Sequence, residues 1–178
     1  MIKEVKKLLY IFSSSELVII YSMVILLIYY RNIYTVFILF ILMNKSIIFG
    51  ILKNKALKYD IGKRPKGAFN CNFFNCGGIS NLGGMPSGHM GFIGIIIFIV
   101  YNIYKLNNNK NVFYIYALMV VLTGISRYLL KCHTLLQVIM GYIVGLILGI
   151  IFYLLDELLY KEFDIYHKHR IEFYNHFK

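Results

Sequence analysis

Acidic residues are scarce in this sequence, which has 8 Asp and Glu against 19 Lys and Arg and a formal net charge of +11. Residues 1–155 carry 15 basic and three acidic residues, whereas the segment from Asp156 onward carries four basic and five acidic residues. The positive excess therefore does not sit on a detachable basic arm. This distribution argues against nucleic acid as a partner and favours anionic lipid headgroups.

Cysteine is also scarce, and its three positions are Cys71, Cys76 and Cys132. Their spacing matches no metal-ligand pattern, so they do not predict a metal site. Cys71 and Cys76 share a loop and would pair if that loop faced an oxidising space. The alternative, which we favour, is that both remain free thiols.

Charged residues of both signs make up only 15% of the chain, whereas hydrophobic residues make up 59% and the mean hydropathy is +0.66. A soluble domain of 178 residues could not bury that much apolar surface. The composition therefore predicts an integral, multi-pass membrane protein and excludes a soluble one. The length favours a single domain, which we expect to comprise residues 1–178.

Five segments approach the roughly 20 mainly apolar residues that a helix needs to span a bilayer. They are residues 15–30, 33–52, 86–106, 112–130 and 134–158. Asn44, Lys45 and Ser46 interrupt the second segment, so the first two are alternatively one tilted helix plus a re-entrant piece. The tail, residues 159–178, alternates charged and aromatic residues and predicts an interfacial helix or a disordered segment. We thus predict an all-α membrane helical bundle with about five spans.

Five spans would place the chemically interesting connections on one side of the membrane. These are the connection that ends near Arg64, the start of the third span at Pro86, and the connection from Arg127 to His133. The N-terminus would share that side and the C-terminus would lie opposite. Residues 53–66 hold the largest cluster of basic residues, which is Lys53, Lys55, Lys58, Lys63, Arg64 and Lys66, with Asp60 as the one acid. As an alternative to ligand binding, such stretches are typical of juxtamembrane segments that follow the positive-inside rule.

The string Pro86-Ser87-Gly88-His89 opens the third apolar segment. Proline fits the first turn of a helix, and we expect the backbone N–H groups of Ser87, Gly88 and His89 to point freely out of the helix end. Such an end binds anions, and the helix dipole strengthens it. The Ser87 hydroxyl would add a donor, and His89 could give a proton to a departing oxygen. The alternative is an ordinary helix start with a histidine at the membrane interface.

His133 lies at the break between the last two predicted spans. An imidazole nitrogen there could attack phosphorus and form a phosphohistidine, which divides one hard step into two easier ones. Gln137 lies one helical turn further on, and its amide oxygen could accept the N–H of the other ring nitrogen. Alternatively, Thr134 and Gln137 form a capping box and Gln137 is purely structural.

Arg64 and Arg127 are the candidates for binding the charge of a phosphate. A phosphate dianion in a poorly hydrated site favours planar, bidentate donors, which arginine supplies and lysine does not. Charged residues at membrane depth usually face a cavity or a partner. The alternative for each arginine is that its side chain snorkels toward the lipid headgroups.

Together these residues resemble the type 2 phosphatidic acid phosphatase (PAP2) superfamily, which shares its fold with the vanadium haloperoxidases. The three motifs of that family appear in order as Arg64-Pro65, Pro86 to His89, and Ser126-Arg127-x5-His133, so the resemblance covers about residues 50–150. It implies that His133 is the nucleophile and His89 the general acid. It also implies that Arg64, Ser87, Gly88 and Arg127 hold the phosphoryl oxygens, and that no metal or other cofactor is needed.

The first family motif also contains a lysine seven residues before its arginine, and Leu57 stands at that position here. Lys58 is one residue closer, and Gly62 could break the helix and let the Lys58 side chain swing into the site. We therefore assign the lysine role to Lys58. Lys55 and Lys63 are the substitutes.

The third family motif ends in an aspartate, which Gln137 replaces in this chain. Glutamine could orient an imidazole but could not stabilise its cation as a carboxylate does. His133-Thr134-x-x-Gln137-Val138-x-x-Gly141 is similar to the dolichyl diphosphate phosphatase branch, and Gly84-Met85-Pro86-Ser87 fits that branch too. The replacement is therefore interpreted as the mark of a subgroup.

The resemblance implies a membrane phosphatase that removes the terminal phosphate of a lipid phosphomonoester or diphosphate. The lipid headgroup would enter at the helix ends while its hydrocarbon stays in the bilayer. The alternative is a catalytically impaired lipid-phosphate binder or scramblase-like protein of the same fold, which the departures at Leu57 and Gln137 favour. The sequence does not distinguish phosphatidate-type substrates from polyprenyl diphosphates.

Overall fold

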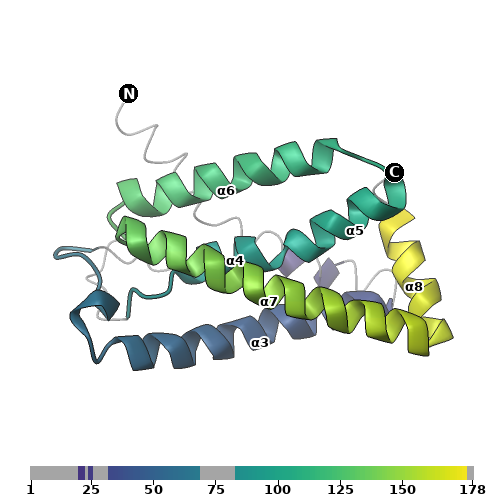
Figure 1. The fold of residues 1–178 in the computed structure, drawn as a ribbon, viewed down its shortest axis with the longest axis horizontal. Helices are drawn as coiled ribbons and strands as arrows, with labels where there is room; N and C mark the ends of the chain where they lie inside the picture. Colours follow the sequence, from purple (N-terminus) through teal and green to yellow (C-terminus); the bar gives the residue numbers. More distant parts are fainter. Residues whose placement is uncertain (1–19, 23, 26–31, 69–82, 176–178) are drawn as a thin grey trace.

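The computed structural model describes residues 20–22, 24–25, 32–68 and 83–175, and all the long elements in this part of the chain are helices (Figure 1). They are α3 (Ile33–Ala56), the short 3-10 helix η1 (Asp60–Gly62), α4 (Gly88–Ile95), α5 (Ile97–Asn107), α6 (Asn111–Leu129), α7 (Leu135–Glu162) and α8 (Asp164–Asn175). The predicted all-α bundle is confirmed.

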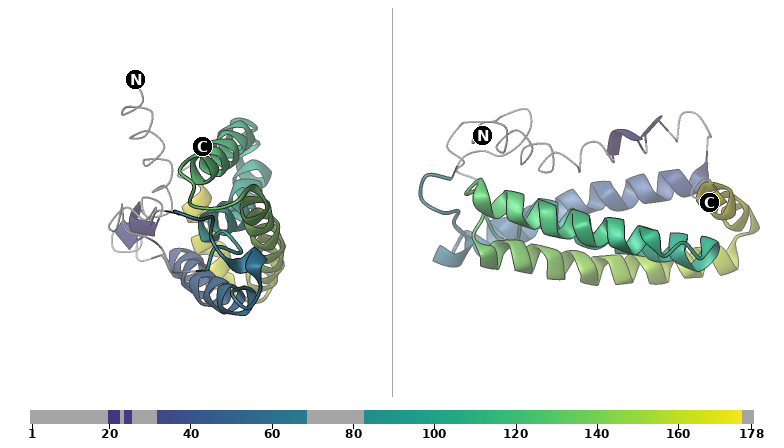
Figure 2. Two further views of the ribbon diagram at one scale, coloured as in Figure 1. Left: turned by 90° about the vertical axis from the view of Figure 1, so that its left-hand side faces the viewer. Right: turned by 90° about the horizontal axis from the view of Figure 1, so that it is seen from above.

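The described residues contain four helical stretches long and apolar enough to cross a membrane: α3, α4 together with α5, α6, and α7. They correspond to the last four of the five predicted segments, and the first, residues 15–30, lies outside the described residues except for a few positions. The stretches run lengthwise beside one another, as the views in Figures 1 and 2 agree. The protein is an integral membrane protein.

α3 is one continuous helix of 24 residues, so the predicted alternative of a re-entrant second segment is wrong for this part of the chain. The polar interruption does not break it, because Asn44 folds back and donates to the Phe40 carbonyl at 2.8 Å while Lys45 is buried, with only 4% of its surface exposed. Asn32 caps the start of α3 by accepting a hydrogen bond from the Tyr34 N–H.

The predicted third span is divided at Ile96 into α4 and α5, and α4 packs closely against α7. Glycine makes this close approach possible. A Cβ added to Gly94 would lie 2.6 Å from the Tyr142 carbonyl oxygen, and one added to Gly149 would lie 2.9 Å from the Ile95 carbonyl oxygen. The small-residue stripe of Gly141, Gly145 and Gly149 therefore lets the two backbones touch, as in other membrane helix pairs. This contact fixes the position of the α4 N-terminus.

The ends of these helices sort into two groups. The C-terminal ends of α3 and α6 and the N-terminal ends of α4 and α7 meet at one end of the bundle, which we call the site end (Figure 1). This arrangement confirms that the connections carrying Arg64, Pro86 and His133 share one side. α8 lies at the opposite end, as predicted for the C-terminus. The N-terminus lies outside the described residues.

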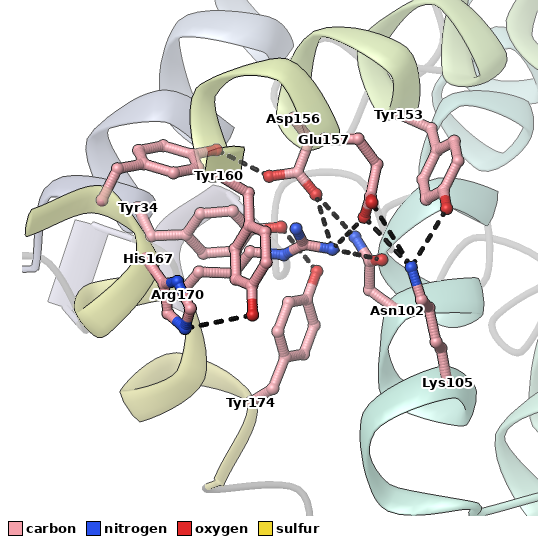
Figure 3. Close-up of polar contacts among 11 residues, drawn as sticks. Tyr34, Asn102, Lys105, Tyr153, Asp156, Glu157, Tyr160, His167, Arg170 and Tyr174 are labelled. Carbon is pink, nitrogen blue, oxygen red and sulfur yellow. Dashed lines mark hydrogen bonds and ion pairs between the residues drawn. The ribbon is translucent and has the colours of Figure 1, made fainter. Parts of the chain in front are cut away.

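The C-terminal tail is a helix that docks on the bundle, so the alternative of a disordered tail is wrong for the described residues up to 175. α8 buries Tyr166, Arg170, Phe173 and Tyr174. Arg170 lies between Asp156 at 3.3 Å and Glu157 at 2.7 Å (Figure 3). This buried ion pair joins α8 to the last turns of α7.

Hydrogen bonds extend the same cluster to the other helices that reach this end (Figure 3). Asn102 of α5 donates to Asp156 at 2.8 Å and accepts from Arg170 at 2.9 Å. The hydroxyl groups of Tyr34, at the start of α3, and Tyr174 lie 2.6 Å apart. The opposite end is therefore tied together by polar contacts among α3, α5, α7 and α8.

Candidate active site

Ser87 marks the start of α4 and is fully buried against α7. Its N–H donates to the Gln137 carbonyl at 3.0 Å, and a Cβ on Gly141 would lie 2.9 Å from the same nitrogen. The prediction that the Ser87 N–H is free is therefore wrong, and Pro86 precedes the helix cap instead of lying in the first turn. The remaining first-turn N–H groups start at Gly88 and have no acceptor inside the helix.

The Ser87 hydroxyl is buried and has no hydrogen-bond partner among the described residues. An unsatisfied buried hydroxyl is uncommon in a folded protein and calls for an explanation. Its location beside the open N–H groups of the α4 N-terminus provides one, because an anion there would accept from both.

His133 lies in the turn between α6 and α7, and 2% of its surface is exposed. Its Nδ1 lies 2.9 Å from the Gly84 carbonyl oxygen. Since a carbonyl only accepts, Nδ1 must carry the proton, which leaves Nε2 with its lone pair in the neutral ring. The contact thus leaves Nε2 in the unprotonated form that a nucleophilic role would require.

The pKa of His133 is held well below its usual value of 6.5. Burial is the main cause, and the positive charges of Arg127, Arg64 and Lys53 act in the same direction. The ring is therefore neutral at physiological pH, which is the form that a nucleophile requires.

Gln137 does not orient His133 in the structure, so that expectation is wrong and Gly84 takes its place. The Gln137 amide oxygen accepts from the Thr134 N–H at 3.2 Å, and the Gln137 backbone N–H donates to the Thr134 hydroxyl at 3.3 Å, which confirms the alternative of a capping box. Its Nε2 donates to the carbonyls of Ile61 at 3.0 Å and Lys63 at 2.7 Å. Gln137 therefore anchors the segment that leads to Arg64 onto the start of α7.

Arg64 follows directly after this anchored segment and is half-buried. Its Nη1 donates to the Cys132 carbonyl at 3.4 Å, next to His133, and its Nε is buried without a hydrogen-bond partner among the described residues. Burial lowers the pKa of this guanidinium. Arg64 thus contacts the turn that carries the candidate nucleophile, and its Nε–H remains able to donate to a ligand.

Arg127 ends α6 and is buried, with 1% of its surface exposed, so it does not snorkel outward. Its carbonyl accepts the N–H groups of Cys132 at 3.1 Å and His133 at 3.3 Å. The turn that places His133 is therefore built on Arg127. Cys132 is fully buried and disulfide-bonded, whereas the question of pairing between Cys71 and Cys76 lies outside the described residues.

The structure brings Lys53, not Lys58, to the site. A Cβ on Gly88 would lie 3.5 Å from the Lys53 Nζ, so this ammonium sits at the N-terminal turn of α4. Lys58 is exposed in the turn after α3 ends at Ala56, and Lys55 is exposed as well. Lys63 is exposed and bonds to Asp60 at 2.7 Å. The assignment of Lys58 is therefore corrected.

A signal for Lys53 was present in the sequence. Lys45, Phe49 and Lys53 repeat every four residues and so share one helical face. Lys45 and Phe49 are buried on that face, and the Lys45 ammonium lies 5.4 Å from the centre of the Phe92 ring of α4. The spacing of the family motif favours a lysine near position 58. The lysine that reaches the site is instead the one on the buried face of α3.

His89 lies in the first turn of α4, within electrostatic range of the charges of Arg127, Lys45 and Lys53 and of the His133 ring. The two histidines therefore converge at the site end. They share this end with four groups able to bind an anion, which are Lys53, Arg64, Arg127 and the α4 N-terminus with Ser87 and Gly88.

The fold and the site together define an integral membrane bundle with a cluster of cationic residues and two histidines at one end. The chain belongs to the PAP2 superfamily, whose family model matches residues 34–160. The match extends from α3 through α7 and contains every site residue named above. Membership indicates a function of the lipid phosphatase type. No curated protein and no solved structure shows significant similarity to the chain.

Proposed function

We propose that this protein hydrolyses the terminal phosphate of a membrane lipid through a phosphohistidine on His133. The observation that supports the proposal most is the pairing of a neutral, oriented imidazole with unsatisfied buried donors. Nε2 of His133 is left unprotonated by the Gly84 contact, and both the Ser87 hydroxyl and Arg64 Nε lack partners among the described residues. A phosphoryl group would satisfy these donors and present its phosphorus to the ring.

In the first step, Nε2 of His133 attacks phosphorus, and the bond from phosphorus to the lipid oxygen breaks. His89 donates a proton to that oxygen, so the lipid leaves as an alcohol or, from a diphosphate, as a monophosphate. Charge develops on the phosphoryl oxygens, where Arg64, Arg127, Lys53 and the α4 N-terminus supply fixed positive potential.

In the second step, water attacks the phosphohistidine. His89, now unprotonated, accepts a proton from that water as the new P–O bond forms and the P–N bond breaks. Inorganic phosphate leaves, and both imidazoles return to their starting forms. All the groups involved come from the chain itself, and the step sequence calls for no metal or other cofactor.

The Gly84 carbonyl performs part of the role for which the family uses an aspartate. It fixes the tautomer of His133, but a neutral carbonyl stabilises a ring cation less than a carboxylate does. Gly84 and Gln137 are also linked sterically, because a Cβ on Gly84 would lie 2.5 Å from the Gln137 amide oxygen. Gly84 and Gln137 are therefore packed against each other. Their likeness to the dolichyl diphosphate phosphatase branch is the ground on which we propose a polyprenyl diphosphate as the substrate.

Phosphate release by the purified protein, with EDTA present, tests this proposal. We expect release from at least one of phosphatidate, lysophosphatidate, diacylglycerol pyrophosphate and a polyprenyl diphosphate, with the last the fastest. Binding of these lipids without any release would favour the alternative, a lipid-phosphate binder or scramblase-like protein of the same fold. That alternative rests on the absence of a carboxylate from the His133 hydrogen bond.

A further inference from the structure

An apolar groove opens on the surface between α6 and α7. Val120, Gly124 and Tyr128 line it from α6, and Leu135, Val138 and Tyr142 line it from α7. Met90 of α4 also lines the groove. Its lining is almost entirely apolar, which suits a hydrocarbon and no polar ligand.

The groove begins at the same end of the bundle as the proposed catalytic residues. Met90 follows His89, Tyr128 follows Arg127, and Leu135 comes two residues after His133. Two other apolar grooves lie toward the opposite end of the bundle, one beside Tyr101 and Tyr153 and one beside Ile33 and Leu159. The groove between α6 and α7 thus starts at the site end, whereas these two lie away from it.

A hydrogen-bonded pair of tyrosines lies at the end of the groove away from the site, where Tyr142 lines it. The Tyr116 hydroxyl of α6 lies 3.3 Å from the Tyr142 hydroxyl of α7 and donates to the Ile93 carbonyl of α4 at 3.0 Å. This bridge joins three helices. From Tyr128 to Val120 on α6 and from Leu135 to Tyr142 on α7, the helical rise gives a groove about 10 to 12 Å long, enough for roughly eight to ten carbons of an extended alkyl chain.

We propose that this groove seats the part of the substrate's hydrocarbon tail nearest the phosphate, and that the Tyr116–Tyr142 bridge sets how many carbons it holds. The inference rests on the proposed function. Lipid tails are as apolar as the groove, so the groove selects by shape and not by a gain in hydrophobic burial. Beyond the bridge, the tail turns out into the bilayer.

Phosphate release from lysophosphatidates of increasing chain length tests the groove. Gly124→Leu places a side chain in the groove, while Gly124→Ala keeps ordinary contacts because its Cβ would lie 3.6 Å from Val138. Leu118→Phe is the control, since Leu118 is exposed on α6 and is not among the lining residues. The ratio of variant to wild-type kcat/KM is compared at each chain length, so that partition into the micelles cancels.

For Gly124→Leu we expect a ratio near one for a four-carbon tail and a fall of about tenfold or more for long tails. Tyr116→Ala should move the chain length at which kcat/KM stops rising to longer tails. Gly124→Ala, which adds one methyl group to the same groove, should give a smaller fall at long tails, and the control Leu118→Phe should give a flat ratio near one. A flat ratio for both Gly124→Leu and Tyr116→Ala would overturn the groove while leaving the phosphatase assignment intact.

A second measurement uses the wild-type protein and needs no activity. A non-hydrolysable alkyl phosphonate with a photoreactive group near its eighth carbon is cross-linked to the protein, and the labelled peptides are mapped. Labelling of α6 and α7 around Val120 and Tyr142 supports the proposal. Labelling confined to α3 or α8 would overturn it. If the wild type released no phosphate from any lipid, the proposed function would fail, and this mapping would still decide whether the groove holds a tail.

Discussion

Both ends of the bundle contain buried cationic side chains, but they differ in whether carboxylates of the protein balance the charge. At the opposite end, Arg170 is enclosed by Asp156, Glu157 and Asn102, so its charge is balanced within the protein (Figure 3). At the site end, Lys53, Arg64 and Arg127 gather around two histidines. Asp60, the acidic residue described there, is exposed and bonded to Lys63.

The comparison separates a structural use of charge from a chemical one. Among the described residues, the acids other than Asp60 all lie in α7 and α8 toward the opposite end, where Asp156 and Glu157 hold helices together. The Arg170 Nε, like the Ser87 hydroxyl and the Arg64 Nε at the site end, has no hydrogen-bond partner among the described residues, but among these residues only the Arg170 cation is paired with carboxylates. We infer that the anion that balances the site end is the phosphate of the substrate.

The largest expected effect comes from removing the candidate nucleophile. His133→Ala should lower phosphate release by roughly a thousandfold or more, because no neighbouring group can replace Nε2 in forming the covalent intermediate. The measurement is phosphate release, with size-exclusion profile and helical content as controls for folding. Substantial activity in a folded His133→Ala protein would show that the site end is not the reaction centre.

The next effect should appear at the opposite end and on stability instead of chemistry. Asp156→Ala leaves Arg170 buried without its carboxylate partner, which should cost about 3 to 5 kcal/mol of stability. Thermal unfolding in detergent measures it, and Asp60→Ala, at an exposed ion pair, is the matched control with no resolvable change expected. If Asp156→Ala unfolded no more easily than Asp60→Ala, the cluster would not be the structural tie that we describe.

Lysine substitutions sharpen the comparison within the site end. Lys53→Ala should lower kcat/KM by roughly 10- to 100-fold, the value of a hydrogen bond to a charged group. Lys58→Ala, five residues later but exposed, should stay within about twofold of wild type. The reverse order of effects would restore the motif-based assignment of Lys58.

The smallest effect is a shift in pH dependence. His133 must be neutral to attack, and its pKa lies well below 6.5, so activity should fall only as the pH drops below that range. Arg64→Gln removes one of the charges that depress this pKa, so the acid limb of kcat/KM should move to higher pH. Arg64→Lys keeps the charge and should not move the limb, whatever it does to the rate. An unchanged acid limb in Arg64→Gln would mean that the Arg64 charge does not act on the pKa of His133.

Much of the bundle was predictable because the apolar runs are long. The four described spans start and end within a few residues of the predicted segments, and the motifs correctly placed Arg64, Ser87 and His133 at one end. The start of α7 was predictable from Thr134 and Gln137, whose capping box is local. Local patterns of this kind do not depend on how helices pack.

The parts that could not be predicted depend on packing between distant segments. Gly84 is 49 residues from His133 and contributes only a backbone carbonyl, which no side-chain motif reveals. Lys53 reaches the site because the face of α3 that carries Lys45, Phe49 and Lys53 packs toward α4. The docking of α8 depends on Arg170 meeting Asp156, whereas its sequence alone shows only alternating charged and aromatic residues.

The most direct test of the central claim is to trap and locate the phosphoenzyme. The protein is mixed with a lipid diphosphate carrying a labelled terminal phosphate and quenched rapidly in alkali, in which phosphohistidine survives. We predict that the label is found on His133 and is absent from His133→Asn. Label on another residue, or phosphate release with no labelled protein at any reaction time, would contradict the account.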